Sequence, residues 1–417
     1  MKDLSMGSAK RSKCGKSFSS TGYVPDSLLI HILHRMPVKS VFRSKCVSKQ
    51  WLSIISEPSF VEDYVARVSH SQPRQWTFLK RSMHVEGSIP LEYDLLRNLN
   101  ASLIDNKSTS ISMVAFPGNE KQQQESLSPH GDVIVAISNG VLLCRRTDML
   151  NVYDYCIFNP ITRCCIVLPP PTSSVRSFSE GFLTHVEGGT IVSFKVVRLE
   201  KCKELTTIQN FEVFDSETGE WQEYKANLPQ AVSSLFCLRP VAFNGILHWF
   251  DWVAMDFIIA YDPYKNPSCC RLINLPGSSR GMCDVFQGRL ACIELSSAND
   301  YDDRQDDHGF DWNLNLWTLQ DYDKEDWNLE KKDTISDVSD DQWAPMAFHP
   351  LNPDVFYFFG KGTRVASLNV QTKKLEVADH PDLVGDAVAW YWLLLFQFVL
   401  PPWPTAIPQP TWKALKS

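Results

Sequence analysis

One hairpin signal recurs along most of this chain and limits the folds open to it. Asn-Gly, or in one case Gln-Gly, lies between two apolar runs in AISNGVLLC (136–144), AFNGILHWF (242–250) and VFQGRLACI (285–293). Residues of such a pair accept positive φ, which suits the two-residue turn of a β-hairpin. The sequence therefore predicts antiparallel strands joined by tight turns.

A second signal is an apolar strand that ends in Asp or Asn and is followed by a turn and a return strand. It occurs at Asn159, Asp215, Asp262, Asp321 and Asn369, in steps of 56, 47, 59 and 48 residues. A period near fifty, built from short antiparallel strands, is typical of a propeller with one four-stranded blade for each repeat. We expect five or six blades. The alternative fold is a β-sandwich or a two-sheet open array.

Two further segments bear on the closure of such a ring. Strand-like runs WTFL (76–79) and SISMVAF (110–116) place a further blade within residues 72–117. The longest apolar run, VAWYWLLLFQFVL (388–400), is too short to span a bilayer. We predict that it supplies the strand that closes the ring.

Residues 24–65 follow a different pattern, which predicts three or four short helices. Pro25 and Asp26 are typical of a helix start, and Pro37 ends the first helix. Trp51 and Pro58 fall in the third and fourth helices. So small a unit buries little surface, so its apolar residues must be covered by the rest of the chain or by a partner.

The charge is divided between these two parts. Residues 1–70 carry 11 Lys and Arg against 5 Asp and Glu, a net charge of +6, whereas the remainder carries 30 against 43, a net charge of −13. This asymmetry indicates two modules with different partners. The acidic module lacks the clustered basic residues that a nucleic-acid surface needs, so we expect no nucleic-acid partner.

The helical stretch resembles the F-box, and most closely its plant form. The matches include the two proline breaks, the paired leucines and the Cys-Val-Ser-Lys segment before the tryptophan. They are Pro25, Asp26, Leu28, Leu29, Ile32, Leu33, Arg35, Pro37, Lys39, Ser40, Arg43, Cys46, Val47, Ser48, Lys49, Trp51, Ile55, Ser56, Pro58 and Phe60. The departures are Val24, His31 and Met36, which keep size or helix compatibility.

This resemblance implies a docking function. An F-box binds a Skp-type adaptor and, through it, a cullin and a RING protein of an SCF-type ubiquitin ligase. It implies the following adaptor-binding residues: Pro25, Leu28, Leu29, Ile32, Leu33, Pro37, Val38, Val41, Cys46, Val47 and Trp51. Lys39, Arg43, Lys45 and Lys49 either rim that contact or form a solvated face.

The repeats resemble, more loosely, the F-box-associated interaction domain of plant F-box proteins, because they lack the glycine pairs and spaced aromatics of kelch units. The implied fold is α+β multidomain, with a small helical F-box followed by an all-β propeller-like domain. The implied function is a non-catalytic receptor that holds an unknown protein substrate for ubiquitination. Trp249, Trp252 and Trp312 are candidate substrate anchors, and we favour a core position for Trp249.

The expected organisation has five parts and no signal peptide or membrane segment, which predicts a cytoplasmic or nuclear protein. Residues 1–20 form a disordered tail, 21–68 the F-box, 69–130 a connecting region with a possible first blade, 131–400 the propeller-like domain and 401–417 a Pro-rich tail.

Chemistry-bearing motifs are sparse in this sequence, so we expect no cofactor and no metal. The 12 Cys include no CxxC, and we expect reduced core thiols. The acidic run 299–311 lacks the glycine and the final acid of an EF-hand loop. Asp251, Asp262 and Glu294 could converge in a central channel. The alternative function is therefore a propeller enzyme, or a scaffold whose N-terminal helices pack in cis.

Overall fold

The computed structural model describes most of the chain in two compact units, Met1–Arg67 and Val68–Ser417, which we treat separately. The described residues are 24–71, 76–81, 133–147, 153–162, 164–172, 178–187, 190–234, 237, 239–250, 256–276, 281–297, 310–338, 343–359, 364–379, 394–399 and 401–408. The predicted strand at 110–116 and the acidic run up to residue 309 lie outside them.

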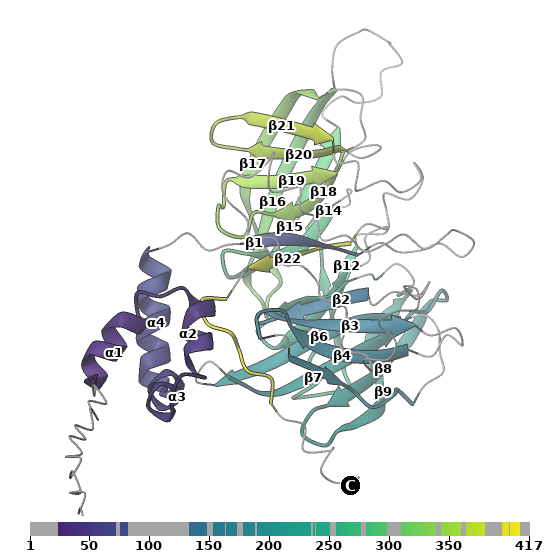
Figure 1. Cartoon of the computed structure of the whole chain (residues 1–417). Helices are drawn as coiled ribbons and strands as arrows, with labels where there is room; N and C mark the ends of the chain where they lie inside the picture. Colours follow the sequence, from purple (N-terminus) through teal and green to yellow (C-terminus); the bar gives the residue numbers. More distant parts are fainter. Residues whose placement is uncertain are drawn as a thin grey trace, which may run out of the picture. The chain divides into compact units, whose positions relative to one another are not determined.

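Four helices form the first unit, as predicted (Figure 1). They are α1 (Asp26–Leu33), α2 (Val38–Ser44), α3 (Lys49–Ser56) and α4 (Pro58–Ser71). Pro25 and Pro37 precede the first two helices in an extended conformation that presets each helix start. The hydroxyl of Ser48 accepts from the backbone N–H of Trp51 at 3.2 Å and so caps α3.

The helical unit has a small apolar core. Tyr64 joins α4 to the end of α1 by donating its hydroxyl to the carbonyl oxygen of Met36 at 2.8 Å. His34 stacks on Phe60 with 4.7 Å between ring centroids. The buried residues are Leu29, Leu33, Val41, Ile54, Ile55, Phe60 and Tyr64.

The second unit is a five-bladed propeller, at the lower of the two expected blade numbers. Each blade is an antiparallel sheet of four successive strands. The first blade is β2 (Val133–Ser138), β3 (Val141–Thr147), β4 (Tyr153–Asn159) and β5 (Cys164–Val167). The second is β6 (Phe178–Glu187), β7 (Thr190–Glu200), β8 (Thr206–Asp215) and β9 (Glu220–Val232). The third is β10 (Val241–Phe243), β11 (Ile246–Phe250), β12 (Phe257–Tyr261), β13 (Cys270–Asn274).

The last two blades follow the same order. The fourth is β14 (Gly281–Phe286), β15 (Arg289–Ser297), β16 (Phe310–Asp321), β17 (Asp326–Val338). The fifth is β18 (Ala344–Phe348), β19 (Val355–Phe359), β20 (Arg364–Asn369), β21 (Lys374–Asp379). Apolar clusters from facing sheets join the first blade to the second, the second to the third, the third to the fourth and the fourth to the fifth.

A two-stranded sheet joins the two ends of the propeller unit. β1 (Trp76–Arg81) pairs antiparallel with β22 (Leu394–Val399), with Trp76 opposite Val399. Phe396 and Phe398 pack into a cluster of the first blade, and Gln397 donates to the carbonyl oxygen of Phe348 in the fifth blade at 2.6 Å. The described part of residues 388–400 thus pairs with β1 in a sheet separate from the five blades and contacts the first and the fifth of them.

The turns match both sequence signals. Asn139 and Gly140 have φ of 46° and 74°, and the Asn244-Gly245 and Gln287-Gly288 pairs are alike. Each pair joins the first two strands of its blade. Positive φ at both positions is the geometry of a type I′ turn.

The five Asp and Asn markers all lie between the third and fourth strands of their blades. Each side chain accepts from the backbone N–H groups of the turn, as Asp321 does from Asp323 and Lys324 at 3.0 and 3.1 Å. Asn159, Asp215, Asp262 and Asn369 do the same. These are Asx turns, and the fifty-residue repeat of the sequence is the repeat of this turn.

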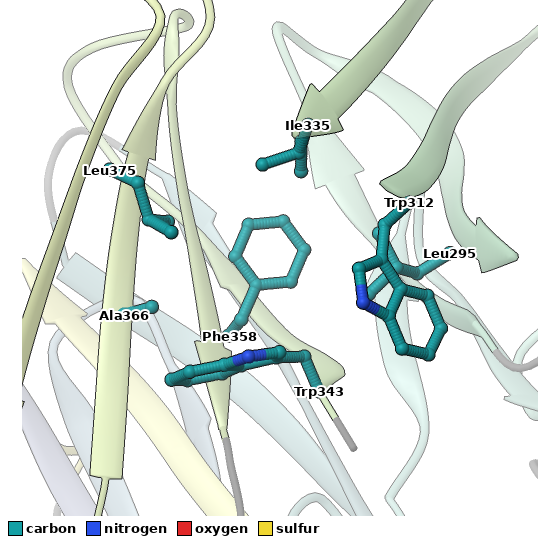
Figure 2. A pocket seen from close by; sticks show the side chains of 7 residues that line it. All are labelled: Leu295, Trp312, Ile335, Trp343, Phe358, Ala366 and Leu375. Carbon is teal, nitrogen blue, oxygen red and sulfur yellow. The ribbon is translucent and has the colours of Figure 1, made fainter. Parts of the chain in front are cut away.

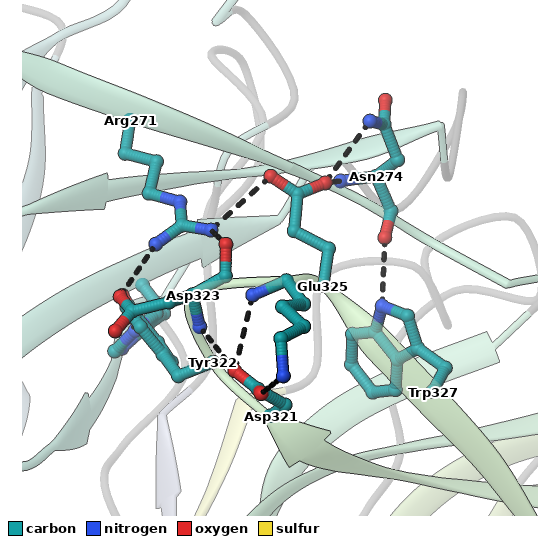
Figure 3. Close-up of polar contacts among 9 residues, drawn as sticks. Arg271, Asn274, Asp321, Tyr322, Asp323, Glu325 and Trp327 are labelled. Carbon is teal, nitrogen blue, oxygen red and sulfur yellow. Dashed lines mark hydrogen bonds and ion pairs between the residues drawn. The ribbon is translucent and has the colours of Figure 1, made fainter.

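Two tryptophans that follow these turns bridge adjacent blades. The indole N–H of Trp327 donates to the carbonyl oxygen of Asn274 on the third blade at 2.8 Å, while the Glu325 carboxylate accepts from the backbone N–H of Asn274 at 3.1 Å (Figure 3). The indole of Trp221 donates likewise to Pro169 at 2.8 Å. The outer edge of one blade is thus capped by the next.

The expectation of reduced cysteines is wrong at one place. Cys283 and Cys292 form a disulfide across β14 and β15. They lie directly opposite each other in the hairpin closed by Gln287-Gly288. The other described cysteines are free thiols: Cys46, Cys144, Cys156, Cys164, Cys165, Cys202, Cys237, Cys269 and Cys270.

Residues 401–408 form a strap along the turns of the first blade. Asn159 donates from its side-chain amide to the carbonyl oxygen of Thr405 at 2.7 Å, and the Thr405 hydroxyl donates to the carbonyl oxygen of Asn139 at 3.2 Å. Ile191 of the second blade donates its N–H to Ala406 at 3.3 Å. A Cβ at Gly140 would lie 2.6 Å from Pro401, so this turn requires glycine for contact as well as for φ.

Antiparallel order separates the connections of each blade into two groups. The turns between strands one and two and between strands three and four all lie at one end of the strands. The connections between strands two and three, and those between blades, lie at the opposite end. Of the helices in the described part of the chain, none is long and apolar enough to cross a membrane.

Candidate docking and substrate-binding surfaces

The predicted adaptor-binding residues divide into three groups by exposure. Val38 and Trp51 are half-buried, and Leu29, Leu33 and Val41 are buried. The remaining six are exposed: Pro25, Leu28, Ile32, Pro37, Cys46 and Val47.

Leu29, Leu33 and Val41, which the resemblance assigned to adaptor binding, are buried within the helical unit. Leu29 is 2% exposed and the other two are fully buried, so they form the core on which the helices pack. The physical reason is that α1 carries two adjacent apolar stripes, and only one of them faces the other helices.

The outward stripe of α1 is the exposed apolar feature of this unit. Val24, Leu28 and Ile32 follow at intervals of four residues and are 37%, 52% and 43% exposed. Val47 and Leu52 add 63% and 46% exposed side chains before and within α3. Sequence reasoning missed Val24 and Leu52 as site residues; Val24 precedes Pro25, the N-cap of α1, so the helical spacing of Leu28 and Ile32 does not extend to it.

Hydrogen bonds hold the start of α1 beside α3. Gln50 donates to the carboxylate of Asp26 at 2.6 Å and to the carbonyl oxygen of Val24 at 3.3 Å. The exposed stripe of α1 therefore begins next to the residues of α3. We refer to Val24, Leu28, Ile32, Val47 and Leu52 together as the outer apolar residues.

The basic residues predicted for the rim are mostly in solvent. Lys39, Arg43 and Lys49 are exposed, whereas Lys45 is half-buried with its ammonium 4.4 Å from the centroid of the Phe42 ring. Burial lowers the pKa of Lys45. Exposed positive side chains of this kind can steer an acidic partner.

The three tryptophans considered as substrate anchors have different positions in the propeller. Trp249 is fully buried, and its indole donates to the hydroxyl of Ser179 at 3.0 Å. It is a core residue, as the sequence favoured. Trp252 lies outside the described residues. Trp312 is half-buried and lines a pocket.

That pocket lies between the fourth and fifth blades (Figure 2). Its empty space is about 250 Å³, including the part that opens to solvent. Every side chain that lines it is apolar or aromatic: Leu295, Trp312, Ile335, Trp343, Phe358, Ala366 and Leu375. The sequence singled out only Trp312. Of the other six, five lie on strands of the fourth and fifth blades and Trp343 directly precedes β18, and no local pattern predicts that they meet.

The residues considered for catalysis have other partners. Asp262 holds an Asx turn, and Glu294 accepts from the side-chain amide of Asn315 at 3.4 Å. Asp251 lies outside the described residues. His248 is buried between the carbonyl oxygen of Val241, at 3.2 Å, and the hydroxyl of Tyr322, at 2.8 Å. Burial lowers the pKa of His248 to about 4.

A buried row of charges crosses the second blade. Glu180, Arg198 and Glu212 lie opposite one another on β6, β7 and β8. Arg198 pairs with Glu212, and Arg145 of the first blade pairs with Glu180. Glu212 also accepts from the backbone N–H of Thr172 at 2.7 Å. Because each carboxylate has a guanidinium partner, we assign the row to holding the connection between these blades.

Among the described residues, no cluster of three or more His, Cys, Asp or Glu side chains is suited to a metal ion. The features that remain as candidate sites are the outer apolar residues of the helical unit and the pocket between the fourth and fifth blades.

Comparisons with known proteins assign both units. A family model described as F-box domain matches residues 24–63, and one described as F-box protein At3g26010-like, beta-propeller, matches residues 106–391. The second model alone spans more than half of the chain.

Relatives from Arabidopsis thaliana match along nearly the whole length. F-box protein At3g26010 is 24% identical, with 94% of this chain and 92% of that protein covered. F-box protein At1g49990 is 24% identical, with 91% and 97% covered, and F-box protein At3g28330 is 24% identical, with 87% and 86% covered. The chain therefore belongs to the family of F-box proteins in which an N-terminal F-box domain is followed by an At3g26010-like β-propeller.

Proposed function

We propose that this chain is the substrate-recognition subunit of an SCF-type cullin–RING ubiquitin ligase. The helical unit binds a Skp-type adaptor and, through it, the cullin and the RING protein. The propeller binds a protein substrate. The role follows from the family, and the adaptor surface follows from the exposure of particular side chains.

The observation that carries the adaptor assignment is the outward stripe of α1. A free helical unit with Leu28 and Ile32 about half exposed leaves apolar area in water that a partner would cover. Apolar helix faces of this kind pack into grooves of a partner through residues spaced by three and four. The exposed prolines Pro25 and Pro37 set the conformation at which α1 and α2 begin.

The proposed mechanism is proximity and requires no catalytic residue of this chain. A receptor that holds adaptor and substrate together raises the effective concentration of substrate lysines near the conjugating enzyme. The loops between strands two and three and the connections between blades lie together at one end of the blades. We assign substrate contacts to this end, because loops on a rigid scaffold carry most binding residues.

Adaptor capture by the full-length chain tests this proposal. A purified Skp-type adaptor should be retained by the wild type. Leu28→Ala combined with Ile32→Ala should weaken retention at least about tenfold, since central apolar anchors dominate such interfaces. These side chains are exposed, so the variant should keep the unfolding midpoint of the wild type.

Leu205→Ala is the matched control. Leu205 is 73% exposed and lies in the propeller, on the connection between β7 and β8, so its loss should leave adaptor capture unchanged. The proposal fails if the wild type captures no adaptor, or if the double variant captures it as well as the wild type does. Leu29→Ala and Leu33→Ala are unsuitable, because truncating buried leucines costs about 2–5 kcal/mol of folding free energy.

A further inference from the structure

The strap, residues 401–408, fills a groove at the turns of the first two blades and is the yellow segment that continues from β22 in Figure 1. Asn139 and Asn159 belong to the two turns of the first blade, and Ile191 lies near the start of β7 in the second. Four of the eight strap residues are prolines, which fix φ and reduce the conformational entropy lost on binding. The strap therefore shows what kind of segment this groove accepts.

Two hydrogen bonds of the groove recognise the backbone of the strap. The Asn159 side-chain amide donates to the carbonyl oxygen of Thr405 at 2.7 Å, and the backbone N–H of Ile191 donates to that of Ala406 at 3.3 Å. The Asn159 amide is available for this bond because its Oδ1 holds the Asx turn. Any segment of the same conformation offers the same two carbonyl oxygens, so this part of the recognition does not depend on sequence.

Side chains of the strap define the chemistry that the groove selects. Thr405 is 8% exposed, and its hydroxyl donates to the carbonyl oxygen of Asn139 at 3.2 Å. Two residues later, Ile407 packs on the apolar cluster of the first and second blades. Pro401 lies against the Cα of Gly140, and the strap carries no charged residue. The groove therefore fits an uncharged segment with a hydroxyl residue two positions before an aliphatic one.

The hairpin that contains Ile191 also has apolar side chains in solvent. Val186 lies opposite Ile191 and Val192 follows it, and they are 38% and 45% exposed. A segment of another protein that covers these side chains as well would gain contacts that the strap lacks. The strap has a different advantage, because its link to β22 keeps it at an effective concentration on the order of millimolar or more.

We propose that this groove is a second protein-docking site of the propeller, which the strap of the same chain closes. The partner presents a segment with the chemistry of the strap: rich in proline, uncharged, and with a threonine or serine two residues before an aliphatic side chain. Strap and partner exclude each other, so release of the strap controls docking. The groove lies at the end of the blades opposite the loops assigned to the substrate, and the inference thus goes beyond the proposed function.

Binding of a peptide with the sequence of the strap tests the proposal. The probe is WPTAIPQ, residues 403–409, labelled with fluorescein, and the matched probe has aspartate in place of its isoleucine. The protein is the full-length chain with Ile407→Asp, which places a charge against an apolar cluster and should release the strap. Fluorescence anisotropy should show saturable binding of the first probe to this variant and no binding of the matched probe.

The wild type should bind the first probe at least about tenfold more weakly than Ile407→Asp does. If the strap fills the groove in more than about nine chains of ten, fewer than about one in ten are open, and the apparent affinity falls by that fraction. Hydrogen exchange locates the bound probe. The Ile191 amide should exchange faster in Ile407→Asp than in the wild type, and the probe should slow it again.

Second substitutions in the Ile407→Asp chain test the groove itself. Asn159→Asp replaces a donor to the bound backbone by a carboxylate and should weaken the probe at least about tenfold. Asn369→Asp changes the equivalent turn of the fifth blade and should leave the affinity unchanged. Ile407→Ala removes the anchor without adding a charge, and it takes the place of Ile407→Asp in all these comparisons if that variant does not fold.

Three results would overturn the proposal. They are no saturable binding to the released variant, equal affinity of that variant and the wild type, or binding that leaves exchange of the Ile191 amide unchanged. Each would reduce the strap to a structural tie between the first two blades. Adaptor capture is measured on the same samples. The Leu28→Ala, Ile32→Ala variant should lose capture but bind the probe as the wild type does, so failure of this groove and failure of the receptor role are distinguishable.

Discussion

The indole nitrogen of Trp327 donates to the backbone carbonyl oxygen of Asn274 at 2.8 Å, across the boundary between the third and fourth blades. Trp221 makes the same bond to Pro169 across the boundary between the first and second blades. Each tryptophan stands six residues after the aspartate of an Asx turn, Asp321 or Asp215. The same combination of an Asx turn and a following tryptophan therefore links neighbouring blades at two boundaries.

Substitution of these tryptophans by phenylalanine should destabilise the propeller unequally. Pro169 is half-buried, so Trp221→Phe leaves its carbonyl group poorly hydrated and should cost about 1–3 kcal/mol. Asn274 is exposed, so water replaces the lost donor in Trp327→Phe, which should cost about 1 kcal/mol or less. Urea unfolding midpoints measure both variants. A larger loss for Trp327→Phe would contradict this account of the bonds.

Gln287 occupies a turn position that asparagine fills in the two related hairpins. Its φ is 50°, in the left-handed region, where asparagine is better tolerated than glutamine. Gln287→Asn should therefore raise the free energy of unfolding by a few tenths of a kcal/mol up to about 1 kcal/mol. The reciprocal change Asn244→Gln, at φ of 50°, should lower it by a similar amount. Thermal unfolding of both variants is the measurement, and shifts of the same sign would refute the explanation.

Asn159 holds its Asx turn and also binds the strap, 401–408, which distinguishes it from the other four Asx-turn residues. Its Oδ1 accepts from the turn, and its Nδ2 donates to Thr405 of the strap. Asn159→Asp keeps the acceptor but places a carboxylate against the Thr405 carbonyl oxygen, so we expect the strap to detach. The Ile191 amide, which donates to the carbonyl oxygen of Ala406 in the strap, reports this detachment, and its hydrogen exchange should become faster by tenfold or more.

Asn369→Asp is the control for that change. Asn369 accepts from Gln371 and Thr372 with Oδ1, and aspartate can accept in the same way. The hydrogen-exchange rate of the Ile191 amide, which reports whether the strap is bound, should stay at its wild-type value in this variant. Equal exchange rates in Asn159→Asp and the wild type would show that the strap is held by its other contacts.

The buried His248 makes the propeller sensitive to acid. Its folded pKa of about 4 lies below the ordinary value of 6.5, so the unfolded chain binds more protons between these values. Stability from this group is complete above pH 6.5 and is lost as the pH falls toward 4, by on the order of 3 kcal/mol. Burial lowers the pKa of His349 to about 4 as well, which adds to the same slope.

Removal of the titrating group tests this assignment. His248→Gln should lower stability at pH 7.5 but flatten its decline between pH 6.5 and 4.5. His185→Gln, which changes an exposed histidine, should leave the decline unchanged. Urea midpoints at a series of pH values give the comparison. A wild-type slope in His248→Gln would assign the acid sensitivity to other groups.

Local turn chemistry explains why the blade order could be predicted. Asn159, Asp215, Asp262, Asp321 and Asn369 bond to N–H groups two or three residues away, so their effect is visible in a short stretch of sequence. The disulfide also had a local signal. Cys283 and Cys292 are equidistant from Gln287-Gly288, and a two-residue turn places such residues opposite each other.

Long-range packing explains what the sequence left open. Leu28 and Leu29 are neighbours of one residue type, and only the packing of α1 in the helical unit decides which of the two is buried. The pocket at Trp312 is more distant still, because residues from two blades meet there. No local pattern contains those pairings.

The pairing of β1 with β22 sets an order of events during synthesis. Residues 81 and 394 face each other in this sheet, so more than 300 residues must be translated after β1 before its partner exists. At about 5–20 residues per second, this interval lasts roughly 15–60 seconds. For that time the newborn protein has an unpaired apolar strand directly after its helical unit. A chain that stops before β22 never pairs β1, so the sheet that links both ends of the propeller unit forms only in chains translated past residue 399.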